Sequence, residues 1–413
     1  MEPSKARAWL VAGVATLVMS VSYIDRQTLA ALAPTVRKAL DIDHTQYGLL
    51  TSAFSIAYLV GAPPSGALLD ALGARRGLVV AVLAWSAVAA AHAVAPGFGA
   101  LFALRIGLGL TEAPSFPAAT QSIRRILPPE SRSAGFGLLF TGSSLGAMVA
   151  APLAVRLASA SSWRLAFVAT AAVGLLWVPL WLVASNGRAV RARLDASEGR
   201  AAGAGGGYGE LFADPSVWRA LAVIGASAPA IMFNLNWLPQ LMTEARGMTQ
   251  EDVGRYAWVP PILFDAGALV FGYSASWIER RRTRARGHWD LVVVAALLES
   301  SLVLVPLVHR PVPLMLLVGA SMAGGAGMYV VATADLLARV DPRRTSSASG
   351  LCAAAQSLMH IVVNPVMGRW LDRTHDYHAV VVTLGLLALP GALAFAFVTP
   401  RAPRAGASDA TPA

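Results

Sequence analysis

Apolar runs of about 20 residues recur along the whole chain, and each is long enough to cross the roughly 30 Å core of a bilayer as a helix. The composition agrees, because 56% of the 413 residues are hydrophobic and only 14% are charged. Soluble domains carry about 25% charged residues, and a soluble chain of this length would form several domains joined by polar linkers. The sequence therefore predicts an all-α membrane protein that crosses the bilayer many times.

Twelve transmembrane helices in two pseudo-symmetric six-helix bundles are predicted. The first six spans are expected at residues 8–34, 46–69, 77–96, 98–123, 133–157 and 163–185. The other six are expected at residues 217–242, 252–279, 289–309, 312–338, 347–370 and 378–399. The predicted domains are an N-terminal bundle (1–185), a cytoplasmic linker (186–216), a C-terminal bundle (217–399) and a cytoplasmic tail (400–413). The linker is rich in Gly, Ala and Arg, without apolar periodicity, which predicts a flexible loop.

The net charge of +10 could indicate nucleic-acid binding, but the placement of the basic residues argues against it. With twelve spans and an inside N-terminus, 22 of the 33 basic residues fall on cytoplasmic segments or span ends, and 9 fall on outer ones. This positive-inside bias predicts that both termini are cytoplasmic. The arginine-rich stretch 280–286 is then a topology signal first and a contact for lipid headgroups second.

Several other classes of protein are excluded by the sequence. The first apolar run continues past Asp25 and Arg26 with no signal-peptidase site, so it is expected to be a span and not a signal peptide. The single cysteine, Cys352, excludes an intrachain disulfide. The sequence has no metal-ligand spacing, nucleophile elbow or phosphate loop. We therefore expect no enzyme, no cofactor and no metal.

The stretch RIGLGLTEAPSFP, from Arg105 to Pro117, carries the strongest functional signal. Arg105 and Glu112 are seven positions apart, so on a helix both project from one face. Gly107 and Gly109 lie between them and allow another helix to approach closely. Ionisable groups in hydrocarbon are costly unless they face a partner or a wet cavity, so their default role is functional. The alternative is a buried ion pair that only joins helices.

The two halves of the chain show an internal repeat. Adding 213 to a position carries five residues of the first half onto identical residues of the second: Pro129 onto Pro342, Gly137 onto Gly350, Ser144 onto Ser357, Pro152 onto Pro365 and Arg156 onto Arg369. Their clustering favours a duplicated six-helix unit. Such repeats are the architecture of secondary transporters, whose site lies near the midplane.

A loop after the second span, GALLDALGARRG, resembles the cytoplasmic signature of the major facilitator superfamily. In that family a glycine, an aspartate and arginines brace the second and third helices. The matching positions are Gly66, Asp70, Gly73, Arg75 and Arg76. This chain has alanine where the pattern usually has a basic residue after the aspartate, which weakens the brace.

Within that superfamily the chain is similar to the anion:cation symporters, which carry hexuronates, aldonates, aldarates and related organic anions. The matching segments are SYIDRQTLAALAP (22–34), QYGLLTSAFSIAYLVGAPPSGALLD (46–70), LRIGLGLTEAPSFPAAT (104–120) and SSWRLAF (161–167). The likeness is looser in the second half, mainly SASGL and NPVMG. Carried over by position, the functional residues of the family fall on Tyr23, Asp25, Arg26, Tyr58, Arg105 and Glu112. The resemblance implies proton-coupled symport of a small organic anion.

The chemistry of these residues supports that implication. Arg26 is expected to bind the substrate carboxylate, because guanidinium binds carboxylates bidentately, and Tyr23 and Tyr58 can add hydroxyl donors. Proton coupling requires groups that change charge, which Asp25 and Glu112 can do and arginine cannot. Arg105 is then the expected switch partner. For Asp25 and Arg26 the alternative is snorkelling at a membrane surface.

The second half supplies weaker candidates for substrate binding: Asn234, Asn236, Gln356 and Ser357. Hydrogen bonding between helices is an equal alternative for all four. Four more ionisable residues lie within predicted spans without an assigned role: Asp265, Glu299, Asp335 and His360.

Three alternative functions share this fold: a membrane sensor that does not transport, a drug/proton antiporter and an organic-phosphate antiporter. Arginines in the cavity favour anions over cationic drugs. The expected partners are a small organic anion, protons and the lipid bilayer of a bacterial inner membrane, and the expected state is a monomer.

Overall fold

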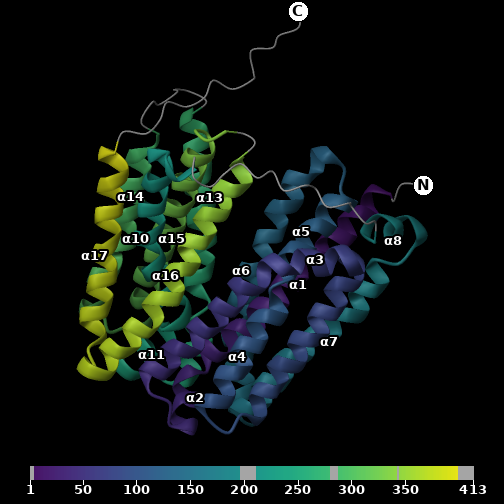
Figure 1. The fold of residues 1–413 in the computed structure, drawn as a ribbon. Coiled ribbons are helices and arrows are strands. Elements are labelled where there is room, and N and C mark those ends of the chain that lie inside the picture. Colours follow the sequence, from purple (N-terminus) through teal and green to yellow (C-terminus); the bar gives the residue numbers. More distant parts are fainter. Residues whose placement is uncertain (1–3, 196–210, 280–286, 342–343, 399–413) are drawn as a thin grey trace, which may run out of the picture. The chain divides into compact units, whose positions relative to one another are not determined.

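The structure is a computed structural model and describes residues 4–195, 211–279, 287–341 and 344–398 (Figure 1). Every regular element in these ranges is helical. The chain divides into two compact units, each described by itself. Unit 1 comprises Met1–Ala201, Met232–Ile262 and His360–Tyr377, and unit 2 comprises Ala202–Ile231, Leu263–Met359 and His378–Ala413.

Unit 1 holds most of the first half of the chain. Its helices are α1 (Lys5–Ala31), α2 (Ala33–Leu40), α3 (His44–Ala91), η1 (His92–Val94), α4 (Phe98–Glu112), α5 (Ser115–Ile126), η2 (Pro129–Ser131), α6 (Arg132–Ala160), α7 (Trp163–Ala184), α8 (Arg188–Leu194), α11 (Leu238–Gln240), the π-helical η3 (Leu241–Ala245) and α12 (Gln250–Tyr256). Unit 2 holds α14 (Trp289–Glu299), η4 (Ser300–Leu307), α15 (Pro311–Leu337) and nearly all of α17 (Tyr377–Phe397). The remaining helices are divided between the units: α10 (Pro215–Asn236), α13 (Val259–Glu279) and α16 (Thr345–Thr374).

Ten stretches of the described helices are long and apolar enough to cross a membrane. They are Lys5–Ala31, Ala71–Val94, Ala134–Ala160, Trp163–Ala184, Pro215–Asn236, Gln250–Glu279, Trp289–Leu307, Pro311–Leu337, Ser347–Thr374 and Tyr377–Phe397. The prediction of an all-α, multi-pass membrane protein is therefore confirmed. The predicted spans 46–69 and 98–123 are not among the ten, so the count of twelve stays a prediction.

The predicted second span and most of the third belong to one long helix, α3, which ends at Ala91. A capping box begins this helix, in which the Asp43 side chain accepts from the backbone N–H of Gln46 at 2.7 Å. The helical backbone is interrupted only at Gly73, whose φ of 75° and ψ of 155° suit glycine. A side chain there would also meet Asp195, because a Cβ would lie 2.9 Å from Asp195 Oδ1. The turn between the two spans thus depends on one glycine.

The predicted fourth span is built from two shorter helices, α4 and α5. The break falls at Ala113 and Pro114, because proline has no N–H to donate and interrupts the helical hydrogen-bond ladder. Glu112 is consequently the last residue of α4.

The expectation that the linker lacks apolar periodicity is wrong at its start. Residues Arg188–Leu194 form α8, in which Val190 and Leu194 are four positions apart and both buried in the core of unit 1. Arg125 ties this helix down, because its Nη1 donates to the Leu194 carbonyl at 2.7 Å. The rest of the linker up to residue 210, the arginine-rich stretch 280–286 and the tail 400–413 lie outside the described residues.

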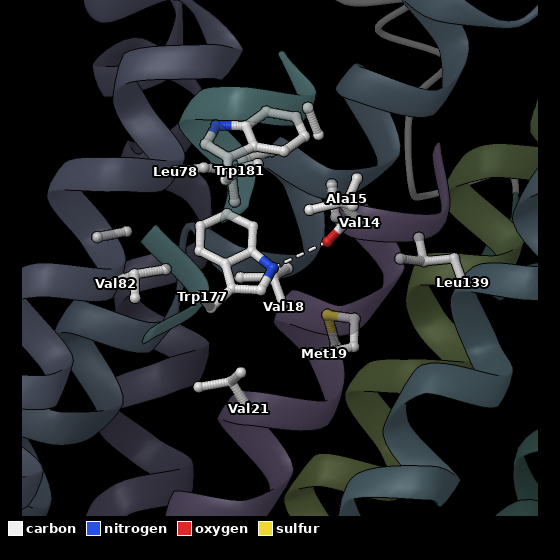
Figure 2. Close-up of a cluster of buried hydrophobic side chains, with 14 of the residues drawn as sticks. Val14, Ala15, Val18, Met19, Val21, Leu78, Val82, Leu139, Trp177 and Trp181 are labelled. Carbon is white, nitrogen blue, oxygen red and sulfur yellow. Dashed lines mark hydrogen bonds between the residues drawn. The ribbon is translucent and has the colours of Figure 1, made fainter. Parts of the chain in front are cut away.

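The core of unit 1 contains two tryptophans from α7 packed against α1 and α3 (Figure 2). The rings of Trp177 and Trp181 stack with centroids 5.5 Å apart. The indole N–H of Trp177 donates to the Val14 carbonyl at 2.9 Å, which joins α7 to α1 (Figure 2). Unit 2 has its own core from α10, α13, α14, α15, α16 and α17.

Close helix approach occurs at one of the two glycines expected to allow it. A Cβ at Gly109 would lie only 2.5 Å from the Phe54 carbonyl oxygen of α3, so α4 and α3 are in contact at their backbones there. At Gly107 a Cβ would make an ordinary contact, 3.4 Å from Val88 Cγ1. The prediction is confirmed for Gly109, and this approach places the functional face of α4 against α3.

Candidate functional site

Arg26 and Glu112 form a salt bridge inside unit 1. Arg26 Nη2 donates to Glu112 Oε2 at 3.0 Å, and Ser22 Oγ donates to the same oxygen at 2.8 Å. Ser22 and Arg26 are one helical turn apart on α1, so both face the end of α4. The Glu112 side chain is fully buried, whereas 20% of the Arg26 side chain is exposed. The arginine is therefore the accessible partner, and the carboxylate lies behind it.

An aromatic cage surrounds the Arg26 guanidinium. Its central carbon lies 4.7 Å from the ring centroid of Tyr23, 4.6 Å from that of Phe54 and 5.0 Å from that of Tyr58. Cation–π attraction holds the charge in place without consuming all of its N–H donors. Tyr23, Arg26 and Tyr58, predicted separately, are thus brought together. Phe54 was not predicted, although it precedes Tyr58 by one helical turn.

Arg105, on α4, also lies over the ring of Phe54. Its guanidinium carbon is 4.8 Å from the centroid of Phe54, and only 3% of the residue is exposed. Its Nε and Nη1 have no hydrogen-bond partner in the described part of the chain. Arg105 and Glu112 do share the buried face of α4, as predicted from their spacing. The salt bridge of Glu112, however, is with Arg26 and not with its expected partner.

Asp25 is a second buried acid in the same unit. Only 2% of the residue is exposed, and neither carboxylate oxygen has a hydrogen-bond partner within bonding distance among the residues described. The indole of Trp85 on α3 is the neighbouring donor. Unit 1 thus buries Asp25, Glu112 and Arg105 and half-buries Arg26, and all four were predicted as site residues.

The candidates from the second half are divided between the units. Asn234 lines a small pocket with Gln27 and Leu238 in unit 1. Asn236 accepts a hydrogen bond from the Tyr47 hydroxyl at 2.7 Å through its backbone carbonyl, so this contact leaves its amide uncommitted. The other two, Gln356 and Ser357, lie on the part of α16 that belongs to unit 2. A substrate-binding role for all four stays a prediction.

The signature loop lies within α3 and makes hydrogen bonds with the C-terminal end of α7. Arg75 Nε donates to Ser185 Oγ at 2.9 Å, and the indole of Trp181 donates to the Arg75 carbonyl at 3.1 Å. Arg76 is exposed. Gly66 and Asp70 lie in α3, and the side chain of Asp70 is outside the described part of the structure.

Two of the unassigned ionisable residues have contrasting surroundings in unit 2. Asp335 forms salt bridges with Arg219 and Arg339, both at 2.8 Å. Glu299 is fully buried, and neither of its carboxyl oxygens has a hydrogen-bond partner within the described ranges. Of the other two, His360 lies on the part of α16 in unit 1 and Asp265 lies on α13 in unit 2, and neither gains an assigned role.

Residues 15–359 match the model of the Major Facilitator Superfamily, and the chain belongs to that family of multi-pass membrane proteins. The chain is 29% identical over 282 residues to a galacturonate transporter of Dickeya chrysanthemi, which covers 65% of this chain and 81% of the relative. It is 26% identical over 416 residues to a hexuronate transporter of Escherichia coli (strain K12), which covers 95% and 94% of the two chains. The resemblance to hexuronate-type anion transporters is thereby confirmed.

A solved structure shares the fold. The inward-facing, unoccupied crystal structure of a bacterial homolog of the human lysosomal transporter Spinster matches with a TM-score of 0.77 and 17% sequence identity, over 96% of this chain and 98% of that one. At this identity the likeness establishes the fold alone. All of these proteins are transporters, in agreement with the expectation that the chain is not an enzyme.

Proposed function

We propose that this protein is a proton-coupled symporter of a small organic anion, most simply a sugar acid such as a hexuronate, aldonate or aldarate. It works by alternating access, with twelve spans in two six-helix bundles and both termini in the cytoplasm of a bacterium. One observation carries the proposal: the accessible Arg26 is bound to a buried carboxylate, Glu112, inside an aromatic cage. The names of the relatives supply the substrate class.

The charges of the site explain why an anion and a proton would move together. With Asp25 and Glu112 ionised, their charges cancel those of Arg26 and Arg105. A substrate carboxylate that binds Arg26 adds one negative charge to a buried site, which is costly. Taking up one proton restores neutrality. Each substrate monoanion therefore favours the binding of at least one proton.

Glu112 occupies the position that the substrate carboxylate would take. Protonation of Glu112 removes its charge and weakens its hold on the Arg26 guanidinium, which can then bind a substrate carboxylate bidentately. Tyr23 and Tyr58 can donate hydroxyls to the same ligand. Ser22 acts as a positioning residue, because its hydroxyl holds Glu112 Oε2 toward Arg26.

Release follows by the reverse exchange. On the cytoplasmic side the substrate leaves, Glu112 loses its proton and the salt bridge to Arg26 forms again. Arg105 interacts electrostatically with Glu112 and favours this ionised state. Asp25 is the candidate for a second proton.

The membrane potential requires such coupling. Inward movement of an anion against an interior-negative potential costs about 2.3 kcal/mol per charge per 100 mV. One proton carried with a monoanion cancels this cost, and a second proton makes the transport step electrogenic and driven inward.

The test is uptake of labelled galacturonate, glucuronate and galactonate by proteoliposomes under an imposed pH gradient. Wild-type protein accumulates one of these substrates. Glu112→Gln mimics the protonated acid, so it should lose accumulation driven by the gradient while keeping exchange of internal for external substrate. Asp25→Asn should damage net uptake similarly if two protons move, and much less if one moves. Accumulation by Glu112→Gln in response to the gradient would show that Glu112 is not the coupling site.

The same assay separates the alternatives. A sensor binds the ligand, detected as a thermal shift, without counterflow, and a drug antiporter accepts cations. Organic-phosphate antiport is the second candidate, because two arginines over Phe54 suit a phosphate as well as a carboxylate. In that case an external phosphate ester, and not a pH gradient, would drive exchange.

A further inference from the structure

A second charged cluster lies in unit 1, apart from the Arg26 site, at the start of α3. The imidazole of His44 is held between two carboxylates. Its Nε2 is 2.8 Å from Glu244 Oε2, and its Nδ1 is 2.8 Å from Asp372 Oδ1. The residue is 9% exposed. Both ring nitrogens are therefore at hydrogen-bond distance from an oxygen of an acid.

The protonation state that fits this geometry follows from donor and acceptor chemistry. An ionised carboxylate only accepts hydrogen bonds, and a neutral imidazole has a single N–H to donate. A neutral His44 would therefore leave one nitrogen lone pair facing a carboxylate oxygen at 2.8 Å. An imidazolium donates to both acids, so the closed cluster is complete when His44 carries two N–H groups.

The surrounding groups keep the two acids ionised. Glu244 accepts from Arg37 Nη1 at 2.6 Å and from the Tyr377 hydroxyl at 2.8 Å. Burial opposes ionisation of Glu244, but the hydrogen bond from His44, the charge of Arg37 and the hydrogen bond from Tyr377 outweigh it and lower the pKa of Glu244.

Asp372 is held by the first turn of α3. It accepts from the backbone N–H groups of His44 and Thr45, at 2.9 and 2.8 Å, and from the Thr45 hydroxyl at 2.5 Å. With both acids committed as acceptors, the imidazole of His44 is the group whose second N–H completes the hydrogen bonds of the cluster.

The cluster joins segments that are far apart in the chain. Arg37 and His44 come from α2 and α3, whereas Glu244, Asp372 and Tyr377 come from η3, the end of α16 and the start of α17. His44 and Asp372 are 328 positions apart. All five residues belong to unit 1. In the predicted topology each of these segments lies at the extracytoplasmic end of its span.

We propose that His44, Glu244 and Asp372, supported by Arg37 and Tyr377, form a proton-binding latch that holds the extracytoplasmic ends of first-half and second-half spans together. The bound ligand is one proton, on His44. With that proton, the four charged groups of the latch are neutral in sum. Without it, the latch carries one net negative charge and one mispaired nitrogen, so its segments separate more readily. This inference goes beyond the transport function and does not depend on which anion is carried.

The direction of the pH dependence follows from the two kinds of group. Because the latch lowers the pKa of Glu244, the stabilisation from its ionised form is complete above the ordinary value of a glutamate and is lost only as pH falls below it. The second N–H of His44 acts oppositely, because its loss removes one of the two hydrogen bonds that the imidazolium donates to the acids. The closed latch is thus expected to weaken at higher pH, when the imidazole no longer carries its second N–H.

Trp237 provides a direct readout that does not require transport. Its indole is stacked on His44, with ring centroids 6.3 Å apart and planes 13° apart, and a protonated imidazole quenches indole fluorescence. In purified protein, fluorescence should rise with pH, and this component should be absent in both His44→Gln and Trp237→Phe. His309→Gln, a change at an exposed histidine in unit 2, is the control and should titrate like wild type.

Opening of the latch is measured by labelling a buried cysteine with an impermeant thiol reagent added from outside. Ala31 is 3% exposed, so Ala31→Cys in a Cys352→Ala background is protected while the latch is closed. Its labelling rate, taken relative to a cysteine at exposed His309 to remove the pH dependence of the thiol, should rise with pH. In His44→Gln the relative rate should be independent of pH.

Two results would overturn the proposal. One is a fluorescence titration in His44→Gln identical to that of wild type. The other is relative labelling of Ala31→Cys that has the same pH dependence with and without His44. Neither result bears on whether a sugar acid is transported, so the latch and the transport proposal can fail separately.

Discussion

Replacing Arg26 by lysine tests the anion site most directly, because the positive charge is kept while the planar fork of donors is lost. Lysine presents one ammonium to a carboxylate that guanidinium binds with two parallel N–H groups. The ammonium of a lysine is also more compact and more strongly hydrated than a guanidinium. It would therefore make weaker contacts with the three aromatic rings, whose centroids lie 4.6–5.0 Å from the guanidinium carbon of Arg26.

The expected loss of substrate affinity follows from the loss of one of the two hydrogen bonds between the guanidinium and the carboxylate. A hydrogen bond to a charged group contributes about 1.5–3 kcal/mol, which corresponds to a loss of affinity of about 10- to 150-fold at about 1.4 kcal/mol per factor of ten. The cation–π contacts add to this, by about 0.5–1 kcal/mol at a partly exposed site. We therefore expect Arg26→Lys to bind substrate at least tenfold more weakly than wild type.

Isothermal titration of galacturonate or glucuronate into purified protein measures the change, and uptake by proteoliposomes provides a second readout. Arg76→Lys is the matched control, because Arg76 is exposed and outside the cage, and it should bind like wild type. Arg26→Lys with wild-type affinity, in a folded protein that still shows a thermal shift with the substrate, would refute the assignment of Arg26 as the carboxylate ligand.

Three further predictions concern the scaffold. Gly109→Ala should weaken substrate binding and stability, because its Cβ would lie 2.5 Å from the Phe54 carbonyl, whereas Gly107→Ala should be tolerated in the same binding and melting assays. Trp177→Phe should lower the free energy of unfolding by at least the roughly 1 kcal/mol of one net hydrogen bond, measured by denaturation in detergent, with exposed Trp289→Phe nearly neutral. A single cysteine at exposed Ala192 on α8 should react with impermeant thiol reagents only from the cytoplasmic side, and labelling from outside would reverse the topology.

What the sequence determined by itself is local. An apolar run of about 20 residues must be a helix in a bilayer, because every backbone polar group has to be satisfied within the segment. The 3.6-residue period likewise determined that Arg105 and Glu112 share one face of α4, which the structure confirms. Two further features are equally local, although they are absent from the predicted spans and linker. Pro114 divides the fourth span into two helices, and Val190 and Leu194, four positions apart, form the buried face of α8.

What only the tertiary structure decided is which charges meet. Glu112 pairs with Arg26, 86 positions away on another helix, instead of with Arg105 on its own helix. The reason is geometric, because Arg105 is seven positions away on the same helix, about 10 Å along its axis, whereas Ser22 and Arg26 of α1 both reach Glu112 Oε2. The latch is the extreme case. Nothing near His44 in the sequence indicates that Asp372 and Glu244 will lie at its two ring nitrogens, because their contact arises from how the folded chain brings distant span ends together.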